Sequence, residues 1–379
     1  MHETVISNAR IVLADEIVDG SVKIVDGIIQ DVATNSSVTG TLDFEGDLLI
    51  PGLVELHTDN LERHAMPRPK SYWPIESAVL NHDREVSAAG ITTVFDALCI
   101  GHMDQGSRSI ESITEMANSI DSLSAKGSLK AEHFLHWRCE VASADVLNNA
   151  FTVSENSRTG LFSVMDHTPG QRQFVSLDAY YTYYQGKYGL NDQQMEQYMT
   201  ERRAVQEKYS APNRREIVKL AHSKSVPIAS HDDATIEHVD EAIEDGIVVA
   251  EFPTTLEAAN ASHKNNLAVL MGAPNVVRGK SHSGNVSARE LASEGLLDIL
   301  SSDYVPFSLL YGAVLLEKHC DNITLPQAIA TVSKNPANQV GLNDRGEIAQ
   351  GKKADLVRFR MDAEVPNVVE VWKNGSRVA

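Results

Sequence analysis

Residues 51–60 read PGLVELHTDN, an apolar run that ends in the polar residues His57, Thr58 and Asp59. In an extended strand, residues two positions apart face the same side, so the side chains of His57 and Asp59 can reach one cation together. A histidine close to an aspartate is more often a structural hydrogen bond, and this pair alone does not separate the two interpretations. The residues at the ends of the other strands decide whether this pair is a metal site or a structural hydrogen bond.

Seven further apolar runs follow this one, and longer helix-like segments separate them. The eight predicted strands are residues 53–57, 92–96, 133–137, 161–166, 227–230, 247–251, 267–271 and 297–301. Eight short strands that alternate with helices are typical of a parallel (β/α)₈ TIM barrel, a single domain of about 250 residues. Nearly every run ends in His, Asp, Glu or Arg, and in a barrel these ends meet at the C-terminal face, where active sites lie.

Both ends of the sequence show a different, β-rich pattern. Short runs occur at 9–13, 21–25 and 28–32, with Asp26 and Gly27 as a hairpin turn, and again at 346–348, 354–359 and 368–372. We therefore predict an α/β protein with two domains. A small β-sandwich is formed by residues 1–50 plus 345–379, and the barrel by residues 51–344.

The barrel is predicted to carry one long insertion, at about residues 170–225. It contains the aromatic run YYTYY at 180–184, a predicted helix at 191–208, and a second predicted helix after Pro212. Connections of this length usually carry function or contacts. A substrate lid and a subunit interface are equally compatible with the sequence.

Composition restricts the expected partners. The chain has 379 residues and a formal net charge of -19, so its field repels nucleic acid and anionic membranes. It lacks a basic segment followed by an apolar one at its start and any apolar run near the roughly 20 residues that span a bilayer, so we expect a cytoplasmic location. Cys99, Cys139 and Cys320 are far apart and fit packed thiols better than a disulfide frame. We expect a small-molecule substrate and a homo-oligomer, a dimer.

Side chains at the strand ends have the chemistry of a metal site. Imidazole nitrogen with carboxylate oxygen suits Zn²⁺, and Mn²⁺ accepts the same donors. Three histidines and three carboxylates suffice for two ions that share a bridging carboxylate, so we expect two divalent transition metals per chain, Zn²⁺ first, with Mn²⁺, Ni²⁺ or Fe²⁺ as alternatives. The predicted ligands are His57, Asp59, Glu140, His167, His231 and Asp303.

Three further acidic residues have alternative interpretations. Asp232 follows His231 and either orients its imidazole or caps the next helix, whereas Asp233 is predicted to be a cap. Asp96 ends the second strand and is either a contact at the barrel mouth or a helix cap. His82 is expected to be an ordinary polar residue.

This pattern resembles the amidohydrolase superfamily: a Pro-Gly opening before His57, two later strand-end histidines, and a final strand-end aspartate. The usual His-x-His of that superfamily is His57-Thr58-Asp59 here, and Glu140 replaces its bridging lysine, so the number and identity of the metals stay open. Longer blocks are similar to a triphosphate-cleaving branch that serves the carbon–phosphorus lyase pathway of phosphonate degradation. They are HTDNLERH (57–64), AEHFLHWRCE (131–140), SVMDHTPGQRQF (163–174), ASHDDAT (229–235), AEFPTT (250–255), LMGAPNVVRG (270–279), SHSGNVSARELAS (281–293) and LLDILSSDY (296–304).

The resemblance implies hydrolysis of the 5-triphosphate of a ribose 1-methylphosphonate, with release of pyrophosphate. Asp303 is the predicted catalytic base, which accepts the proton of the nucleophile. Basic and polar residues in or beside the similar blocks are expected to bind the substrate; they are Arg138, Arg172, Lys187, Arg278, Lys280, His282, Ser283 and Asn285. Two alternatives are a hydrolase of cyclic amides or N-acyl groups, the more common chemistry on this scaffold, and a non-catalytic scaffold barrel.

Overall fold

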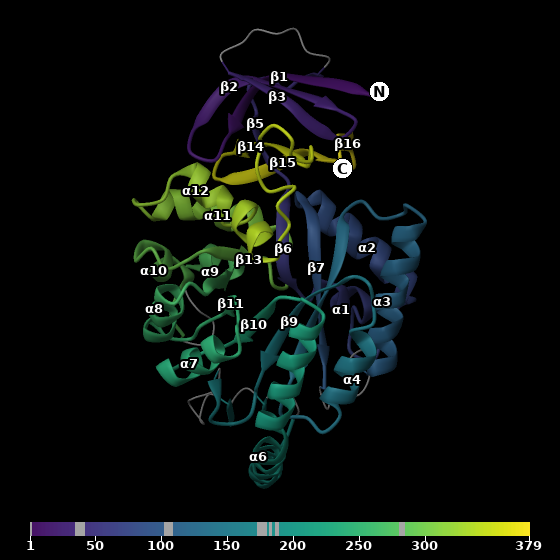
Figure 1. The fold of residues 1–379 in the computed structure, drawn as a ribbon, viewed down its shortest axis with the longest axis vertical. Helices are drawn as coiled ribbons and strands as arrows, with labels where there is room; N and C mark the ends of the chain where they lie inside the picture. The colour runs from purple at the N-terminus through teal and green to yellow at the C-terminus, as the bar shows by residue number, and fades with distance from the viewer. Residues whose placement is uncertain are drawn as a thin grey trace.

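Two eight-stranded sheets form the framework of the protein (Figure 1). The computed structural model describes residues 2–34, 42–101, 109–172, 180–181, 184–185, 189–279 and 285–379. Figure 1 shows the sheet built from the first and last segments at one end of the molecule and helix α6 at the other. The predicted combination of a TIM barrel with a small β domain is confirmed.

The first sheet is a parallel barrel whose strands neighbour one another in chain order. Its strands are β6 (Leu53–Thr58), β7 (Ile91–Ile100), β8 (Glu132–Glu140), β9 (Thr159–Met165), β10 (Ile228–His231), β11 (Val249–Glu251), β12 (Ala268–Gly272) and β13 (Ile299–Ser301). A bridge between Thr58 and Asp303 brings the end of β6 to the residues that follow β13. Each of the eight predicted strands overlaps an observed strand.

Helices pack around the barrel and against one end of it. They are α1 (Asn60–Ala65), α2 (Ile75–Ala88), α3 (Ile110–Ala125), α4 (Val146–Val153), α6 (Asp192–Ser223), α7 (Ile236–Glu244), α8 (Leu256–Lys264), α9 (Ala273–Arg278), α10 (Ala288–Ser293), α11 (Ser308–His319), α12 (Leu325–Ala330) and α13 (Lys334–Gln339). Strand side chains alternate between two cores. Leu56, Phe95 and Leu161 belong to the cluster inside the barrel, whereas Leu135 and Trp137 pack with the apolar faces of the helices.

Helix α6 differs from the two helices predicted in the long insertion. It runs without a break from Asp192 to Ser223, with Pro212 inside it. Proline lacks the N–H that would close a helical hydrogen bond, which is why a helix boundary was predicted there. The neighbouring Asn213 stabilises the continuous helix, because its amide donates to the backbone oxygens of Val141 at 3.0 Å and Ser143 at 2.7 Å.

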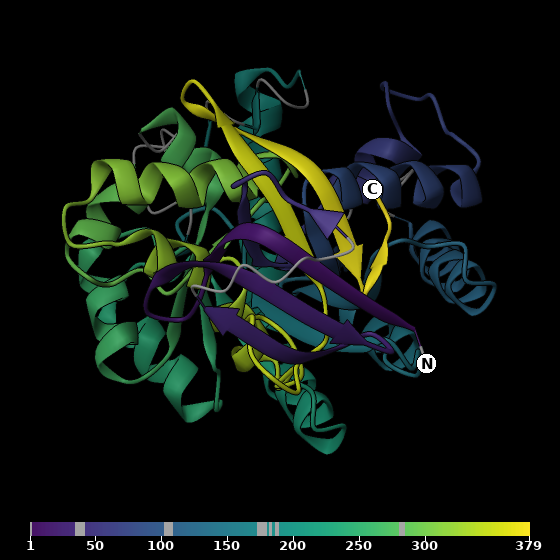
Figure 2. The ribbon, with the colours of Figure 1, turned by 90° about the horizontal axis from the view of Figure 1, so that it is seen from above.

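The second sheet joins strands from the two ends of the sequence. They are β1 (Glu3–Val12), β2 (Ile17–Val25), β3 (Ile28–Thr34), β4 (Leu42–Asp43), β5 (Leu48–Pro51), β14 (Leu356–Asp362), β15 (Val365–Lys373) and β16 (Ser376–Arg377). β14 pairs antiparallel with β5, with Leu356 opposite Pro51. Figure 2 shows these purple and yellow strands lying over the barrel.

One predicted strand of this sheet is wrong. Residues 346–348 lie in a bend and an irregular segment rather than a strand. Gly346 has a φ of 84°, in the left-handed region that interrupts an extended strand, and a Cβ placed on it would lie 2.9 Å from the Cα of Lys334. The close approach of this backbone to α13 therefore replaces strand pairing.

The three cysteines are buried and form no disulfide, as expected for packed thiols. Burial raises the pKa of the Cys139 thiol well above its ordinary value, so this side chain behaves as a small hydrophobic group. Among the described segments, no helix combines the length and the apolar character that crossing a membrane requires.

A buried polar network lies between the barrel and helix α2. Asp96 on β7 lies between two imidazoles, with His82 Nε2 at 2.7 Å from its Oδ1 and His133 Nδ1 at 2.7 Å from its Oδ2. The other ring nitrogen of His133 lies 3.3 Å from Oδ1 of Asp83, on α2. All four side chains are fully buried. Asp96 therefore neither lies at the barrel mouth nor caps a helix, and both alternatives for it are wrong.

This network makes the stability of the fold depend on pH. Burial alone would lower the pKa of His133, but Asp96 and Asp83 outweigh it and raise the pKa from 6.5 to about 9. A pKa that is raised in the folded state stabilises the fold below the unfolded value, and this contribution is lost as the pH rises through the folded value. We expect the free energy of unfolding to lose about 3 kcal/mol from this group between pH 6.5 and 9.

Urea denaturation of the wild type and of a His133→Gln variant at several pH values measures this contribution. The difference in unfolding free energy between the two proteins should shrink as the pH rises, because the variant lacks the titrating imidazole. A difference that stays constant from pH 6 to pH 10 would contradict the role of the His133 charge.

Candidate metal centre

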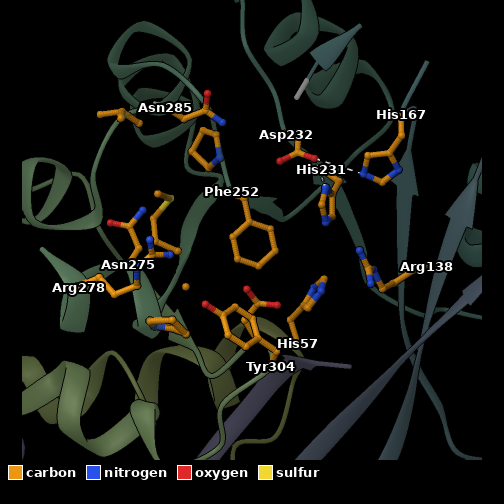
Figure 3. Close-up of a pocket in the computed structure, with 16 residues that line it drawn as sticks. His57, Arg138, His167, His231, Asp232, Phe252, Asn275, Arg278, Asn285 and Tyr304 are labelled. Carbon is orange, nitrogen blue, oxygen red and sulfur yellow. Dashed lines mark hydrogen bonds and ion pairs between the residues drawn. The ribbon is translucent and has the colours of Figure 1, made fainter. Parts of the chain in front are cut away.

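Four of the six predicted metal ligands line one cavity at the carboxyl ends of the barrel strands (Figure 3). They are His57 near the end of β6, His167 after β9, His231 at the end of β10 and Asp303 after β13. Figure 3 shows the three imidazoles on one side of this cavity. The predicted convergence of strand ends therefore occurs. The other two predicted ligands do not line the cavity, but Asp59 contacts Asp303 and Glu140 contacts His167.

The imidazole of His57 is oriented by a buried carboxylate. Its Nδ1 lies 2.9 Å from Oε1 of Glu251, the last residue of β11. This contact leaves Nε2 as the nitrogen available to a ligand, in the arrangement by which outer carboxylates orient metal-bound histidines. Burial, followed by the charges of Arg138 and His231, lowers the pKa of His57 well below its usual value. His57 is therefore a neutral imidazole, the form that binds metals.

His231 shows the same arrangement with a different partner. Its Nδ1 lies 2.7 Å from Oδ2 of Asp232. Its Nε2 is buried and has no hydrogen-bond partner among the residues that the structure describes. A buried nitrogen without a partner carries an unrecovered desolvation cost, and a metal ion would satisfy it. Of the two interpretations of Asp232, the structure supports the one in which it orients His231.

Glu140 contacts both the ring and the backbone of His167. Oε2 of Glu140 lies 2.7 Å from Nδ1 of His167, and Oε1 accepts the backbone N–H of His167 at 3.1 Å. The other ring nitrogen, Nε2, lies 3.5 Å from Oδ2 of Asp232. Burial alone would lower the pKa of His167, but Glu140 and Asp232 outweigh it and raise it to about 9. Glu140 thus orients His167, and its bridging of two metals stays a prediction.

Asp303 and Asp59 are held together by the backbone. The N–H of Asp59 donates to the oxygen of Asp303 at 3.2 Å, and the N–H of Asp303 donates to the oxygen of His57 at 3.2 Å. Burial, and next the charge of Asp59, raise the pKa of Asp303 to about 7. Within the described residues, Oδ1 of Asp59 is buried without a hydrogen-bond partner. A cation between these carboxylates would relieve their repulsion, so the donors present fit a divalent metal.

Three non-glycine residues with a left-handed backbone lie at this site. Asp232, Phe252 and Asp303 have φ values of 58°, 54° and 54°, and each follows the end of a barrel strand. A non-glycine residue in a sparsely populated region costs about 1–3 kcal/mol, and such residues cluster at functional sites. The strain therefore marks the same strand ends as the buried histidines and carboxylates.

The cavity also contains two groups of predicted substrate-binding residues. Arg138 comes from β8 and lies on the side of His57 and His167, whereas Arg278 and Asn285 lie on the opposite side (Figure 3). The predicted residues Lys187, Lys280, His282 and Ser283 lie outside the described residues.

Arg172 is not brought to this cavity. It is buried, and its guanidinium donates to Asp233 and, at 2.7 Å, to Oε2 of Glu241, beside a separate cavity. The same contact corrects the prediction for Asp233. Helix α7 is capped by Thr235, which accepts from the backbone N–H of His238 at 3.4 Å, while Asp233 neutralises Arg172.

Two residues of the site, Glu251 and His136, were not predicted from the sequence. Glu251 is the polar residue at the end of the predicted strand 247–251, and the same strand-end pattern indicated the other ligands, so the sequence could have indicated Glu251 as well. His136 lies in the middle of β8, where no strand-end signal exists, with Nδ1 2.9 Å from the oxygen of Leu56. Burial lowers its pKa to about 3, so it is neutral. Ligand atoms of His57, His136 and Glu251 lie within 4.8 Å of one another, as do those of His167, His231 and Asp232.

The chain belongs to the amidohydrolase family, whose model matches residues 84–379. This confirms the resemblance that the strand-end residues indicated. Over 376 residues the chain is 47% identical to the alpha-D-ribose 1-methylphosphonate 5-triphosphate diphosphatase of Escherichia coli (strain K12), and the match covers 99% of this chain and 100% of that protein. Proteins of this family typically bind divalent metals, and the histidine and carboxylate groups described above are able to do so.

Solved structures share the architecture over the whole chain. A Xaa-Pro dipeptidase with bound methionine is 14% identical with a TM-score of 0.66, and the match covers 100% of both chains. A 5-methylcytosine deaminase from Klebsiella pneumoniae is 13% identical with a TM-score of 0.65, and the match covers 99% of this chain and 98% of that one. At such low identity these similarities establish the fold alone.

Proposed function

We propose that this chain is a metal-dependent hydrolase of alpha-D-ribose 1-methylphosphonate 5-triphosphate. Its products would be pyrophosphate and 5-phospho-alpha-D-ribose 1-methylphosphonate. The observation that carries this proposal is the 47% identity, along the full length, to an enzyme named for that substrate. We also propose that the six predicted ligands, with Asp303 as the base, hold two divalent transition metals, Zn²⁺ first. A homodimer and a cytoplasmic location stay predictions from the sequence.

The residues of the cavity have separate parts in this reaction. Bound divalent metals would supply Lewis acidity to the phosphoryl oxygens and lower the pKa of water at the site. Asp303, whose carboxylate lines the cavity beside the proposed metal ligands, accepts the proton of the attacking water. Water attacks the phosphorus attached to ribose O5; the bond from this phosphorus to the bridging oxygen breaks, and pyrophosphate leaves. Arg138 stabilises the negative charge that develops on the phosphoryl oxygens.

Phosphorus NMR of the metal-loaded enzyme tests the proposal. We expect the three triphosphate signals to be replaced by those of pyrophosphate and a phosphate monoester in equal amounts, with the phosphonate signal retained. Dihydroorotate and hydantoin serve as controls for the alternative amide chemistry. Ring opening of these compounds beside an intact triphosphate would reject the proposal, and activity on neither class, with less than one metal per chain, would favour the non-catalytic scaffold.

A further inference from the structure

We propose that the part of the cavity beyond Phe252 is the subsite for the uncleaved end of the substrate, its 1-methylphosphonate. In this subsite, Arg278 is the residue that determines specificity. This inference rests on the proposed function and adds to it the direction in which the substrate lies. Arg278 and Asn285 then bind the phosphonate end of the substrate rather than its triphosphate.

Phe252 divides the cavity into two parts. Its ring packs edge-on against the two imidazoles, with centroid distances of 5.0 Å to His57 and 5.2 Å to His231. Its backbone N–H donates to the oxygen of Leu270 at 2.8 Å, which fixes its left-handed backbone at the end of β11. Figure 3 shows the ring between the imidazoles and the residues Asn275 and Asn285. The ring therefore forms a wall between the imidazoles and the part of the cavity that Asn275 and Asn285 line.

Hydrogen-bond donors line the cavity on the far side of this wall. Oδ1 of Asn275 accepts the backbone N–H of Ala288 at 3.0 Å, so the NH₂ group of Asn275 is the part left to donate. The guanidinium of Arg278 is exposed and makes no ion pair with any residue in the described part of the chain. Asn285 lines the same part of the cavity. Amide donors beside an unneutralised guanidinium are suited to a compact phosphorus oxyanion.

Apolar surface decides which end of the substrate this subsite accepts. Met271, Pro274 and Val286 line the cavity together with the three donors. A methylphosphonate on a sugar offers a methyl group and ring carbons to such a surface. A pyrophosphate group has neither, and it would lose hydration at an apolar wall without compensation. The pyrophosphate therefore extends from the metals toward Arg138, and the phosphonate toward Arg278.

Removing the phosphonate from the substrate tests this assignment. The kcat and KM of the metal-loaded enzyme are measured for the full substrate and for D-ribose 5-triphosphate. In the wild type, kcat/KM should favour the full substrate. In Arg278→Gln, kcat/KM for the full substrate relative to that for D-ribose 5-triphosphate should fall by about 10- to 100-fold. The fall should come from a higher KM for the full substrate, because the charge-assisted pair between the guanidinium and the phosphonate is lost. Arg278→Lys should restore part of this ratio.

Arg203→Gln is the matched control, because Arg203 is an exposed arginine on α6 that does not line the cavity. It should leave both kcat/KM values unchanged. An Arg278→Gln variant that loses activity equally on both substrates would place the triphosphate at Arg278 and overturn the inference, as would one that loses activity on neither. A wild type that cleaves neither triphosphate would instead reject the proposed function, so the two failures are distinguishable.

Discussion

An Asp303→Asn variant should keep its fold and most of its metal and lose about 10²- to 10⁴-fold in kcat, the usual contribution of a general base. An amide has nearly the shape of the carboxylate, and its oxygen can still contact a cation. It cannot accept a proton at neutral pH. Steady-state kinetics of pyrophosphate release, with metal analysis of the same samples, measures both effects.

Asp240→Asn is the control for this variant, because Asp240 is an exposed aspartate on α7. It should show wild-type kcat and metal content. If Asp303→Asn retained near-normal turnover, another group would have to accept the proton. If it lost its metal together with its activity, Asp303 would be a ligand whose role as a base stays undemonstrated.

A His231→Ala variant should lose bound metal and, with it, activity. Nε2 of His231 is a buried imidazole nitrogen without a hydrogen-bond partner among the described residues, and Asp232 fixes its direction. Loss of a residue that only hydrogen-bonds a metal ligand typically reduces metal affinity by 10- to 100-fold. Removal of the ligand itself should therefore reduce it by more than about 100-fold. Metal content after dialysis and calorimetric titration with Zn²⁺ measure the loss.

His263→Ala provides the comparison for this experiment. His263 is a half-exposed histidine on α8 that pairs with Asp298 and lies outside the cavity. Its replacement should leave the number of bound metals unchanged. A His231→Ala protein with unchanged Zn²⁺ affinity would remove His231 from the proposed metal site and weaken the assignment of the neighbouring His167.

The barrel was predictable because its strands are buried on both faces. Such strands are short apolar runs, and the polar residues that interrupt the pattern lie where the runs end. His57, His231 and Asp303 were found by this rule, and the structure brings them together. Fold and ligand positions thus follow from the same local pattern.

Side-chain partners across elements were not predictable in this way. Asp96 contacts His82 from a helix and His133 from the next strand, and no local spacing encodes that meeting. Asp233 precedes a helix and matches the composition of a cap, but the distant Arg172 pairs with it instead. Such contacts depend on how the elements pack, which a single sequence does not specify.

The pairing of β5 with β14 has a consequence for how the chain folds as it is made. Leu356 lies opposite Pro51, so the ribosome must add about 300 residues before this pair can form. At 5–20 residues per second, this takes about 15–60 s. Until then the β1–β5 sheet has an unpaired edge at β5, and exposed edges of this kind promote association between chains. We expect nascent chains that have passed β5 but not β14 to be the species most in need of a chaperone.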